Sequence, residues 1–241
     1  MRSSPSGPDP LDPGPRGFAH RGLHFGSAAP ENSLAAFERA IELGAGIECD
    51  VRLSGDGSAV VFHDSDLTRM CGVSLKVEQT PAALLTGQRL TGSNQCIPAL
   101  SRVLEVVGGR VPLLLEFKTD RGNAARLCRA VLSDLSPRCG PIGIMSFDPK
   151  VGGWLRRNAL HIPRGLVVGK DLTRLRRWLA VTIAAPQFLA VDRECLGAPW
   201  VARIRRRMPV CAWTIRTPAE RAQAAVQADA LIWEADGGPR I

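Results

Sequence analysis

The sequence predicts an α/β fold of the (β/α)8 TIM-barrel type, and three observations lead to this prediction. Apolar segments of strand length alternate with helical segments, which is typical of βαβ units around a parallel sheet. Roughly eight such units fit into about 225 residues, a size that favours a closed barrel over an open doubly wound sheet. Neither G-x-G-x-x-G after a strand nor G-x-x-x-x-G-K-[ST] occurs, so dinucleotide-binding and P-loop folds lose their main support.

Strand and helix segments follow one another along the chain with a single interruption. The strand segments are 17–22, 46–53, 58–64, 111–118, 141–147, 164–168, 187–192, 209–215 and 228–233. The helical segments are 31–44, 97–108, 122–135, 148–158, 171–180, 198–208 and 217–227. Residues 65–98 show little periodicity and are predicted to form a short insertion after the early strands.

The local signals within these segments agree with the assignment. In the first helix, Asn32 or Ser33 is placed to cap the beginning and Gly44 to end the last turn. The sequence SGDG separates the second and third strand segments as a turn. Gly152 and Gly153 weaken the helix at 148–158.

Composition limits the class of protein. Hydrophobic residues make up 45% of the chain and charged residues 22%, which is near the globular average. Residues 1–15 are rich in Pro, Gly and Ser and are predicted to be a disordered tail without a secretory signal. Residues 16–241 are predicted to form one domain. No stretch of about 18 apolar residues is present, so no transmembrane segment is expected.

Cysteine usage and charge suggest a compartment and exclude some partners. The seven cysteines form no C-x-x-C pair, and their scatter suits reduced thiols in a cytoplasmic protein. The formal charge of +8 comes from arginines spread along the chain, which favours solvated helix faces over a nucleic-acid interface. Peripheral contact with phospholipid headgroups is kept as the alternative for the basic segments near the C-terminus.

Polar side chains fall where the early strands end. In a parallel barrel these strand ends meet at one face, which carries the functional groups. The residues are His20, Arg21, Glu48, Asp50, His63, Glu116 and Lys118. Side chains alternate along a strand, so Glu48 and Asp50 face one side together, as do Glu116 and Lys118.

Three carboxylates at one barrel mouth predict a metal site. Burying Glu48, Asp50 and Glu116 together without compensation would be costly. A hard divalent cation with oxygen ligands removes this cost, which indicates Mg²⁺ or Ca²⁺ first and Mn²⁺ as an alternative.

The basic groups beside this cluster suit the chemistry of a phosphate ester. His20 and His63 are candidates for a general acid and a general base, because imidazole titrates near neutral pH. Arg21 and Lys118 are candidates for binding phosphate. The remaining histidines, His24 and His161, are predicted to be surface residues.

The motifs as a set resemble the glycerophosphodiester phosphodiesterase family. They are AHRG, PENSLAAF, IECDVRLSGDGSAVVFHDSDLTR, IPALSRVLEVV and LLLEFK, and the resemblance covers about residues 17–233. It implies a TIM barrel that splits glycerophosphodiesters into glycerol 3-phosphate and an alcohol. It also implies an acid/base pair at His20 and His63, metal ligands at Glu48, Asp50 and Glu116, and phosphate contacts at Arg21 and Lys118.

The chain departs from the family pattern in its last two strands. Family members usually carry a stretch like WTVN after the seventh strand, whereas this chain has WTIR with Arg216 in place of the asparagine. Trp213 is kept and is expected to line the substrate pocket. The last strand ends in ALIWE instead of a stretch like GIITD. These differences leave the leaving alcohol open.

Two alternatives to hydrolysis of a small glycerophosphodiester remain at this point. One is related phosphodiester chemistry on a larger lipid, either a lysophospholipase D-like hydrolysis or attack by a substrate hydroxyl that releases a cyclic phosphate. The other is a barrel that binds phosphodiesters without turning them over, although such a protein needs no histidine pair.

Overall fold

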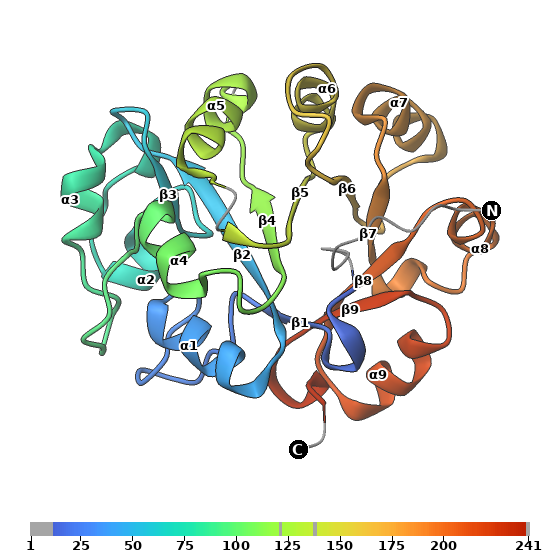
Figure 1. Cartoon of the computed structure of the whole chain (residues 1–241), viewed down its shortest axis with the longest axis horizontal. Coiled ribbons are helices and arrows are strands. Elements are labelled where there is room, and N and C mark those ends of the chain that lie inside the picture. Colours follow the sequence, from blue (N-terminus) through green and yellow to red (C-terminus); the bar gives the residue numbers. More distant parts are fainter. Residues whose placement is uncertain (1–11, 121, 137–138, 240–241) are drawn as a thin grey trace.

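A computed structural model of the chain describes residues 12–120, 122–136 and 139–239. Within these residues, eight parallel strands close into a barrel, because β1 pairs with both β2 and β9 (Figure 1). The barrel strands are β1 (Phe18–His20), β2 (Gly46–Leu53), β4 (Leu113–Phe117), β5 (Ile142–Ser146), β6 (Arg164–Val168), β7 (Phe188–Asp192), β8 (Val210–Ile215) and β9 (Ala230–Trp233). The predicted fold class is confirmed.

A ring of helices surrounds the barrel and connects its strands (Figure 1). These helices are α1 (Leu34–Leu43), α4 (Leu100–Val107), α5 (Ala124–Asp134), α6 (Pro149–Asn158), α7 (Arg174–Ala184), α8 (Pro199–Arg205) and α9 (Pro218–Ala225). The predicted signals at α1 hold: the Ser33 side chain accepts from Ala36 N–H, and Gly44 ends the helix in the left-handed region at φ 69°. Asn32 has a different function, described below.

The third strand segment lies outside the barrel. β3 (Ala59–Val61) runs antiparallel to the upper part of β2, with Val51 opposite Val61. The chain therefore extends beyond the barrel mouth along β2, turns, and returns to the mouth along β3. It reaches the mouth beside Asp50, because the Phe62 N–H donates to the Asp50 C=O. The prediction that His63 lies at the end of a parallel barrel strand was wrong in its geometry, although the hairpin brings the residue to the same face.

The insertion at 65–98 is more regular than its sequence suggests. It contains α2 (Thr68–Cys71), the 3-10 turn η2 (Val77–Gln79) and α3 (Ala82–Thr86). Side chains from β3 and this insertion form a separate apolar cluster, comprising Val60, Phe62, Leu67, Val77, Leu85, Leu90 and Ile97. Elements this short give too few turns for a periodic pattern to be read.

The ends of the chain are described only in part. Residues 1–11 of the predicted tail lie outside the described residues, and Gly14–Arg16 form a short 3-10 turn, η1. Among the residues that the structure describes, no helix combines the length and the apolarity that crossing a bilayer requires.

Two layers of buried apolar side chains stabilise the barrel. The larger one lies between the strands and the surrounding helices, and the smaller one fills the barrel interior around Phe18, Leu114 and Phe188. Glycines make room for the interior aromatic rings: a Cβ on Gly165 would lie 2.3 Å from the Phe188 ring, and one on Gly46 would lie 2.6 Å from the Phe18 ring. Large and small residues therefore alternate across the barrel.

The glycines that weaken helix α6 have a packing function. A Cβ on Gly152 would lie 2.8 Å from the backbone oxygen of Ala184 on α7. Each glycine lowers the helix propensity by about 1 kcal/mol relative to alanine. Because Gly152 has no side chain, however, α6 and α7 can approach each other closely.

We expect Gly165→Ala to lower the free energy of unfolding by about 1–3 kcal/mol, because the new methyl group overpacks the Phe188 ring inside the barrel. Urea unfolding monitored by circular dichroism measures this loss. Gly197→Ala is the matched control, since a Cβ there meets nothing within 4 Å. Equal stability of the two variants would contradict the packing assigned to Gly165.

Candidate active site

The three carboxylates predicted to bind a metal converge at the barrel mouth. Glu48 and Asp50 lie on β2, and Glu116 lies opposite Asp50 on the neighbouring strand β4. One carboxylate oxygen from each residue lies within 4.8 Å of the other two, and all three residues are buried. The residue between them, Cys49, faces the opposite side and packs in the outer apolar layer. This is the alternation predicted for the strand.

The cluster has the donor set of a hard divalent cation. Glu48 Oε1 is buried and has no hydrogen-bond partner among the described residues. Burial raises the pKa of Glu48, and the nearby Asp50 and Glu116 carboxylates raise it further. A buried carboxylate oxygen without a partner is costly, and oxygen ligands suit Mg²⁺, Ca²⁺ or Mn²⁺. Glu48, Asp50 and Glu116 therefore fit a divalent cation and could hold one.

Two cations compensate part of this negative charge. Lys118 Nζ lies 2.5 Å from Glu116 Oε1 and 3.1 Å from Asp50 Oδ1, and Arg21 Nε lies 3.1 Å from Asp50 Oδ2. Although burial opposes it, Lys118 and Arg21 lower the pKa of Asp50 to about 2. Two cations among three carboxylates leave the group with a net negative charge.

His20 is held at the edge of the cluster by a carboxylate from the last strand. Its Nδ1 lies 2.6 Å from Glu234 Oε2, and its Nε2 points toward Glu48 Oε2 at 3.9 Å. Contacts with His20 and His24 hold the pKa of Glu234 well below its usual range. Glu234 is therefore ionised and can only accept, so the proton of neutral His20 sits on Nδ1 and leaves Nε2 free.

The two segments that depart from the family pattern meet at this carboxylate. Arg216, the last residue of WTIR and the first after β8, places its Nε 2.6 Å from Glu234 Oε1, while Glu234 ends the ALIWE stretch. The three side chains therefore form a line, in which Arg216 forms an ion pair with Glu234 and Glu234 contacts His20.

His63 has a matching arrangement on the other side of the cluster. Its Nδ1 lies 2.7 Å from Asp64 Oδ1, and Asp64 Oδ2 lies 2.6 Å from Arg69 Nε. Arg69 in turn contacts Glu31, which pairs with Arg21 at 2.9 Å. A continuous chain of charges therefore joins His63 to Asp50. Burial lowers the pKa values of both His63 and His20, so each imidazole favours its neutral form.

An aromatic pair borders the site. The rings of Trp213 and Phe147 meet edge to face with centroids 5.6 Å apart, and Lys118 Nζ lies 5.8 Å from the Phe147 centroid. Trp213 Nε1 is buried without a hydrogen-bond partner among the described residues. The structure thus places Phe147 against both Trp213 and Lys118, on the same face as the acidic cluster.

Sequence reasoning missed several residues that build the site. Asn32 adopts φ 58°, and its amide exchanges two hydrogen bonds with Asp50, at 2.8 Å and 3.2 Å. Its position beside the cap of α1 made a capping function the simpler interpretation. His24 was predicted to be a surface residue, but it is half-buried, with Nε2 3.8 Å from Glu234. His161 is exposed, as predicted.

The fold and the site together define a TIM barrel whose mouth carries an acidic, potentially metal-binding cluster between two histidines. The model of the glycerophosphoryl diester phosphodiesterase family matches residues 20–235. The chain belongs to this family, and the resemblance seen in the sequence motifs is confirmed.

Relatives with known sequences match over part of their length. A glycerophosphodiester phosphodiesterase from Caldanaerobacter subterraneus is 38% identical over 102 residues, which is 39% of this chain and 40% of that protein. One from Bacillus altitudinis is 38% identical over 109 residues, which is 42% of this chain and 43% of that protein. The chain therefore matches less than half the length of these two curated relatives.

Solved structures match over nearly the whole chain. A phosphodiesterase from Oleispira antarctica, in complex with the product sn-glycerol-3-phosphate, aligns with a TM-score of 0.80 and 25% identity, covering 92% of this chain and 94% of that one. A glycerophosphodiester phosphodiesterase from Thermotoga maritima aligns with a TM-score of 0.72 and 26% identity, covering 90% and 92%.

The acidic cluster makes a prediction about cation binding that does not depend on activity. Saturating Mg²⁺, Ca²⁺ or Mn²⁺ at about 100 times its Kd is expected to stabilise the wild-type protein by about 2.7 kcal/mol. This corresponds to a rise in Tm of about 5–10 °C for a domain of this size. Glu48→Gln is expected to lose this rise while keeping or gaining stability without a cation, because it removes a repelling charge. Differential scanning fluorimetry with and without a chelator measures both.

Glu31→Gln is the matched control for this experiment. Glu31 pairs with Arg21 and Arg69 outside the cluster, so its variant should lose stability with and without the cation and keep the cation-induced rise. A full cation-induced rise in Glu48→Gln would show that the cation binds elsewhere.

Proposed function

We propose that this protein hydrolyses glycerophosphodiesters to glycerol 3-phosphate and an alcohol, with a divalent cation at Glu48, Asp50 and Glu116. The observation that carries the proposal is the pair of histidines beside the acidic cluster, each bound through Nδ1 to its own carboxylate. Family membership supports it, as does the product named for the Oleispira relative.

Charge balance supports a cation at this site. The three carboxylates, Arg21 and Lys118 together carry a charge of −1 when all are ionised, which would repel a phosphodiester anion. Bound Mg²⁺, Ca²⁺ or Mn²⁺ would bring this group to +1 and would supply positive charge for the phosphoryl oxygens. Arg21 and Lys118 can then share their charge between the carboxylates and the phosphate.

The contacts of the two histidines support acid/base catalysis. A carboxylate at Nδ1 fixes the ring and leaves Nε2 as the working atom in both His20 and His63. One Nε2 would accept the proton of the attacking group, which is water or a neighbouring substrate hydroxyl. The other, once protonated, would donate to the leaving alcohol. We keep the assignment of the two roles open.

A lysophospholipase D-like reaction is the second candidate, and the aromatic pair favours it. Phe147 is 49% exposed and packs edge to face on Trp213 next to Lys118. Together these rings give an apolar wall beside the proposed phosphate site, which the acyl chain on the glycerol phosphate part of a lysophospholipid could contact. ³¹P NMR of the products from a small glycerophosphodiester and from a lysophospholipid decides between the candidates and detects a cyclic phosphate. The third alternative, a barrel that only binds phosphodiesters, would predict no turnover with either substrate.

We also propose that the protein acts in the cytoplasm as one domain over residues 16–241, without a nucleic-acid partner. Its cysteines are scattered along the sequence and form no C-x-x-C pair, as expected for a protein of a reducing compartment.

We expect His20→Ala and His63→Ala each to lower kcat by about 10²–10⁴-fold, since each removes one proton-transfer group. Release of glycerol 3-phosphate, followed with a coupled dehydrogenase assay, measures kcat. His161→Ala is the matched control, because this exposed histidine lies between α6 and β6, at the far end of the barrel. Turnover close to wild type in His20→Ala or His63→Ala would remove that histidine from the mechanism.

Glu234 is expected to act as a positioning residue through His20. In Glu234→Gln the amide can donate to Nδ1 and so favour the tautomer whose Nε2 cannot accept a proton. We expect kcat to fall at least about tenfold, less than in His20→Ala, with little change in KM. Arg216→Asn should cause a smaller fall in kcat, because it leaves the carboxylate in place.

Two comparisons separate positioning from a general structural effect. Glu234→Asp keeps the carboxylate and should recover part of kcat. Glu194→Gln breaks an exposed ion pair with Lys170 and should leave both kinetic constants unchanged. An unaltered kcat in Glu234→Gln would contradict the role of this residue.

A further inference from the structure

Helix α7 turns its large apolar side chains away from the protein. Leu175 is 66% exposed and Trp178 is 62% exposed, and Leu179 and Ile183 are also exposed. Spacings of three, four and eight residues place these side chains on one side of the helix. Four of the ten exposed large apolar residues found among the described residues lie on this single helix. We call these four residues the α7 apolar face.

The fully buried positions of α7 are small, and Val181 beside them is only partly buried against the core. These small residues are Ala180 and Ala184, and Ala184 fits against Gly152 of α6. Helix α4 shows the usual pattern for a barrel of this type, since it buries Leu100, Val103, Leu104 and Val107 against the strands. The large residues of α7 therefore contribute little to the barrel core, and their exposure has no explanation in the packing of the domain.

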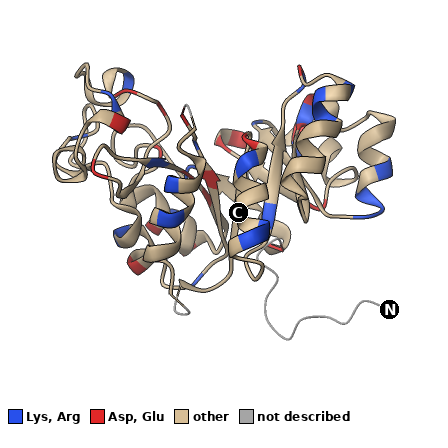
Figure 2. Cartoon of the chain, turned by 90° about the horizontal axis from the view of Figure 1, so that it is seen from above, with Lys and Arg blue, Asp and Glu red and all other residues tan. Residues whose placement is uncertain are grey.

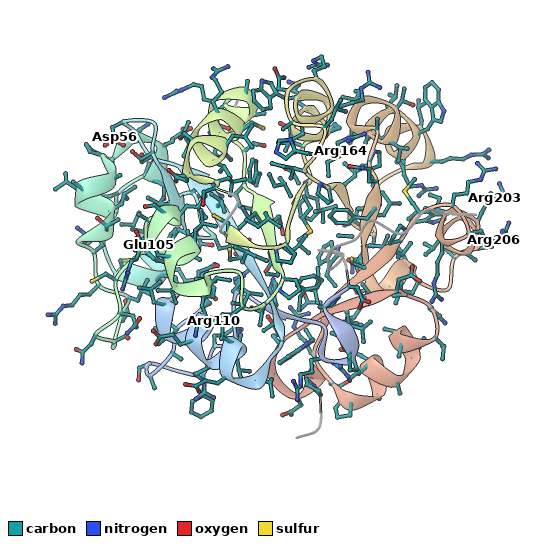
Figure 3. All side chains as sticks on the ribbon, viewed as in Figure 1. Asp56, Glu105, Arg110, Arg164, Arg203 and Arg206 are labelled. Carbon is teal, nitrogen blue, oxygen red and sulfur yellow. The ribbon has the colours of Figure 1, made fainter. Side chains whose placement is uncertain are left out.

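Basic residues surround the α7 apolar face. Arg174 and Arg176 are exposed on either side of it, and helix α8 adjoins α7, because the Arg177 guanidinium lies 4.0 Å from the Trp200 ring centroid. Figure 3 shows Arg203 and Arg206 pointing away from the barrel at α8. Figure 2 marks the basic residues in blue, including those on these helices.

The helices on this side of the ring carry no acidic residue, and the nearby acidic residues Asp171 and Glu194 lie in the segments before α7 and α8. Helices α6, α7 and α8 carry three, three and two basic residues, and none of the three contains Asp or Glu. The excess positive charge of the chain is therefore concentrated around the α7 apolar face.

The position of α7 connects this surface to the barrel mouth. α7 follows strand β6, so its first turn, with Leu175, lies at the end of the barrel where the strands finish. The acidic cluster and the exposed Phe147, in the loop between β5 and α6, lie at the same end.

We propose that the α7 apolar face binds the surface of an anionic phospholipid bilayer, with Leu175, Trp178 and Leu179 entering the interface and the surrounding arginines contacting lipid phosphates. An apolar strip bordered by basic residues and containing tryptophan is the pattern of helices that lie in the membrane interface. Each arginine near an anionic surface adds about 1 kcal/mol to the attraction.

Charge complementarity favours a bilayer over other occupants of this face. A second copy of the chain would bring two sets of arginines together with no acidic residue on α6, α7 or α8 to compensate. A nucleic acid would use the arginines but would leave the apolar strip without a partner. An anionic bilayer satisfies both features at once.

The test is co-sedimentation of the full chain with vesicles of phosphatidylcholine alone or with about one third phosphatidylglycerol. We expect binding to the phosphatidylglycerol vesicles that weakens with salt. In the double variant Trp178→Ser/Leu179→Ser the apparent Kd should rise at least about tenfold. In Arg174→Gln and Arg176→Gln it should rise about fivefold each.

Matched controls lie on the other side of the ring. Leu84 on α3 is exposed and apolar, and Arg102 on α4 is exposed and basic, so Leu84→Ser and Arg102→Gln should bind vesicles like the wild type. All of these variants should hydrolyse a water-soluble glycerophosphodiester at the wild-type rate and unfold at the wild-type temperature.

Three outcomes would overturn the proposal. The first is the absence of sedimentation with phosphatidylglycerol vesicles at low salt. The second is loss of binding in the arginine variants but not in Trp178→Ser/Leu179→Ser, which would indicate unspecific attraction between charges. The third is a wild-type dimer in light scattering that becomes a monomer in Trp178→Ser/Leu179→Ser, which would assign the face to a second copy of the chain.

Discussion

The crowding of Glu48, Asp50 and Glu116 at the barrel mouth is the constraint on which the rest of the site depends. The strands place these carboxylates by register alone, since Asp50 lies opposite Glu116 on the neighbouring strand. Burial makes their mutual repulsion strong, because little water is present to screen it. Each further charge in the site can be understood by its relation to this cluster. Arg21 and Lys118 reduce the repulsion, and Asn32 satisfies the side of Asp50 that faces α1.

The partial compensation of this charge is functionally useful. A cluster fully paired with arginine and lysine would not attract a cation. The Oε1 atom of Glu48, which has no hydrogen-bond partner among the described residues, remains available as a ligand. Two cations for three carboxylates keep the protein folded and still leave a deficit of positive charge. We infer that this incomplete balance of charge suits the cluster to a divalent cation.

Both histidines are supported by the same kind of arrangement from unrelated parts of the chain. His63 and its carboxylate are adjacent in sequence, and the arginine follows in the insertion. His20 is supported by Glu234, which lies 214 positions further along the chain, and Arg216 supports Glu234 in turn. The stretches WTIR and ALIWE, which look like two separate departures from the family pattern, are thus one structural feature. We infer that the change at one position depends on the residue at the other.

The sequence predicts the barrel and the residues at its mouth because both follow from local periodicity and from the rule that parallel strands end together. It does not predict the Glu234–His20 contact, since strand periodicity does not identify which polar residues of the first and last strands will pair. The antiparallel course of β3 was also missed, although the four-residue turn SGDG before it is too short for the crossover that parallel strands require. The function of Asn32 depends on a left-handed backbone conformation, φ 58°, that its sequence neighbours do not indicate.

The same logic explains why α7 differs from the other helices of the ring. The buried positions of α7 are Ala180 and Ala184, and Ala184 packs closely against Gly152 of α6, so the large residues of this helix lie elsewhere on its surface. The small inner residues therefore separate the outer surface of α7 from the packing of the strands. The residues on that surface can therefore be replaced without moving Glu48, Asp50 or Glu116. Catalysis and surface contact can consequently change independently in this chain, although both lie at the same end of one barrel.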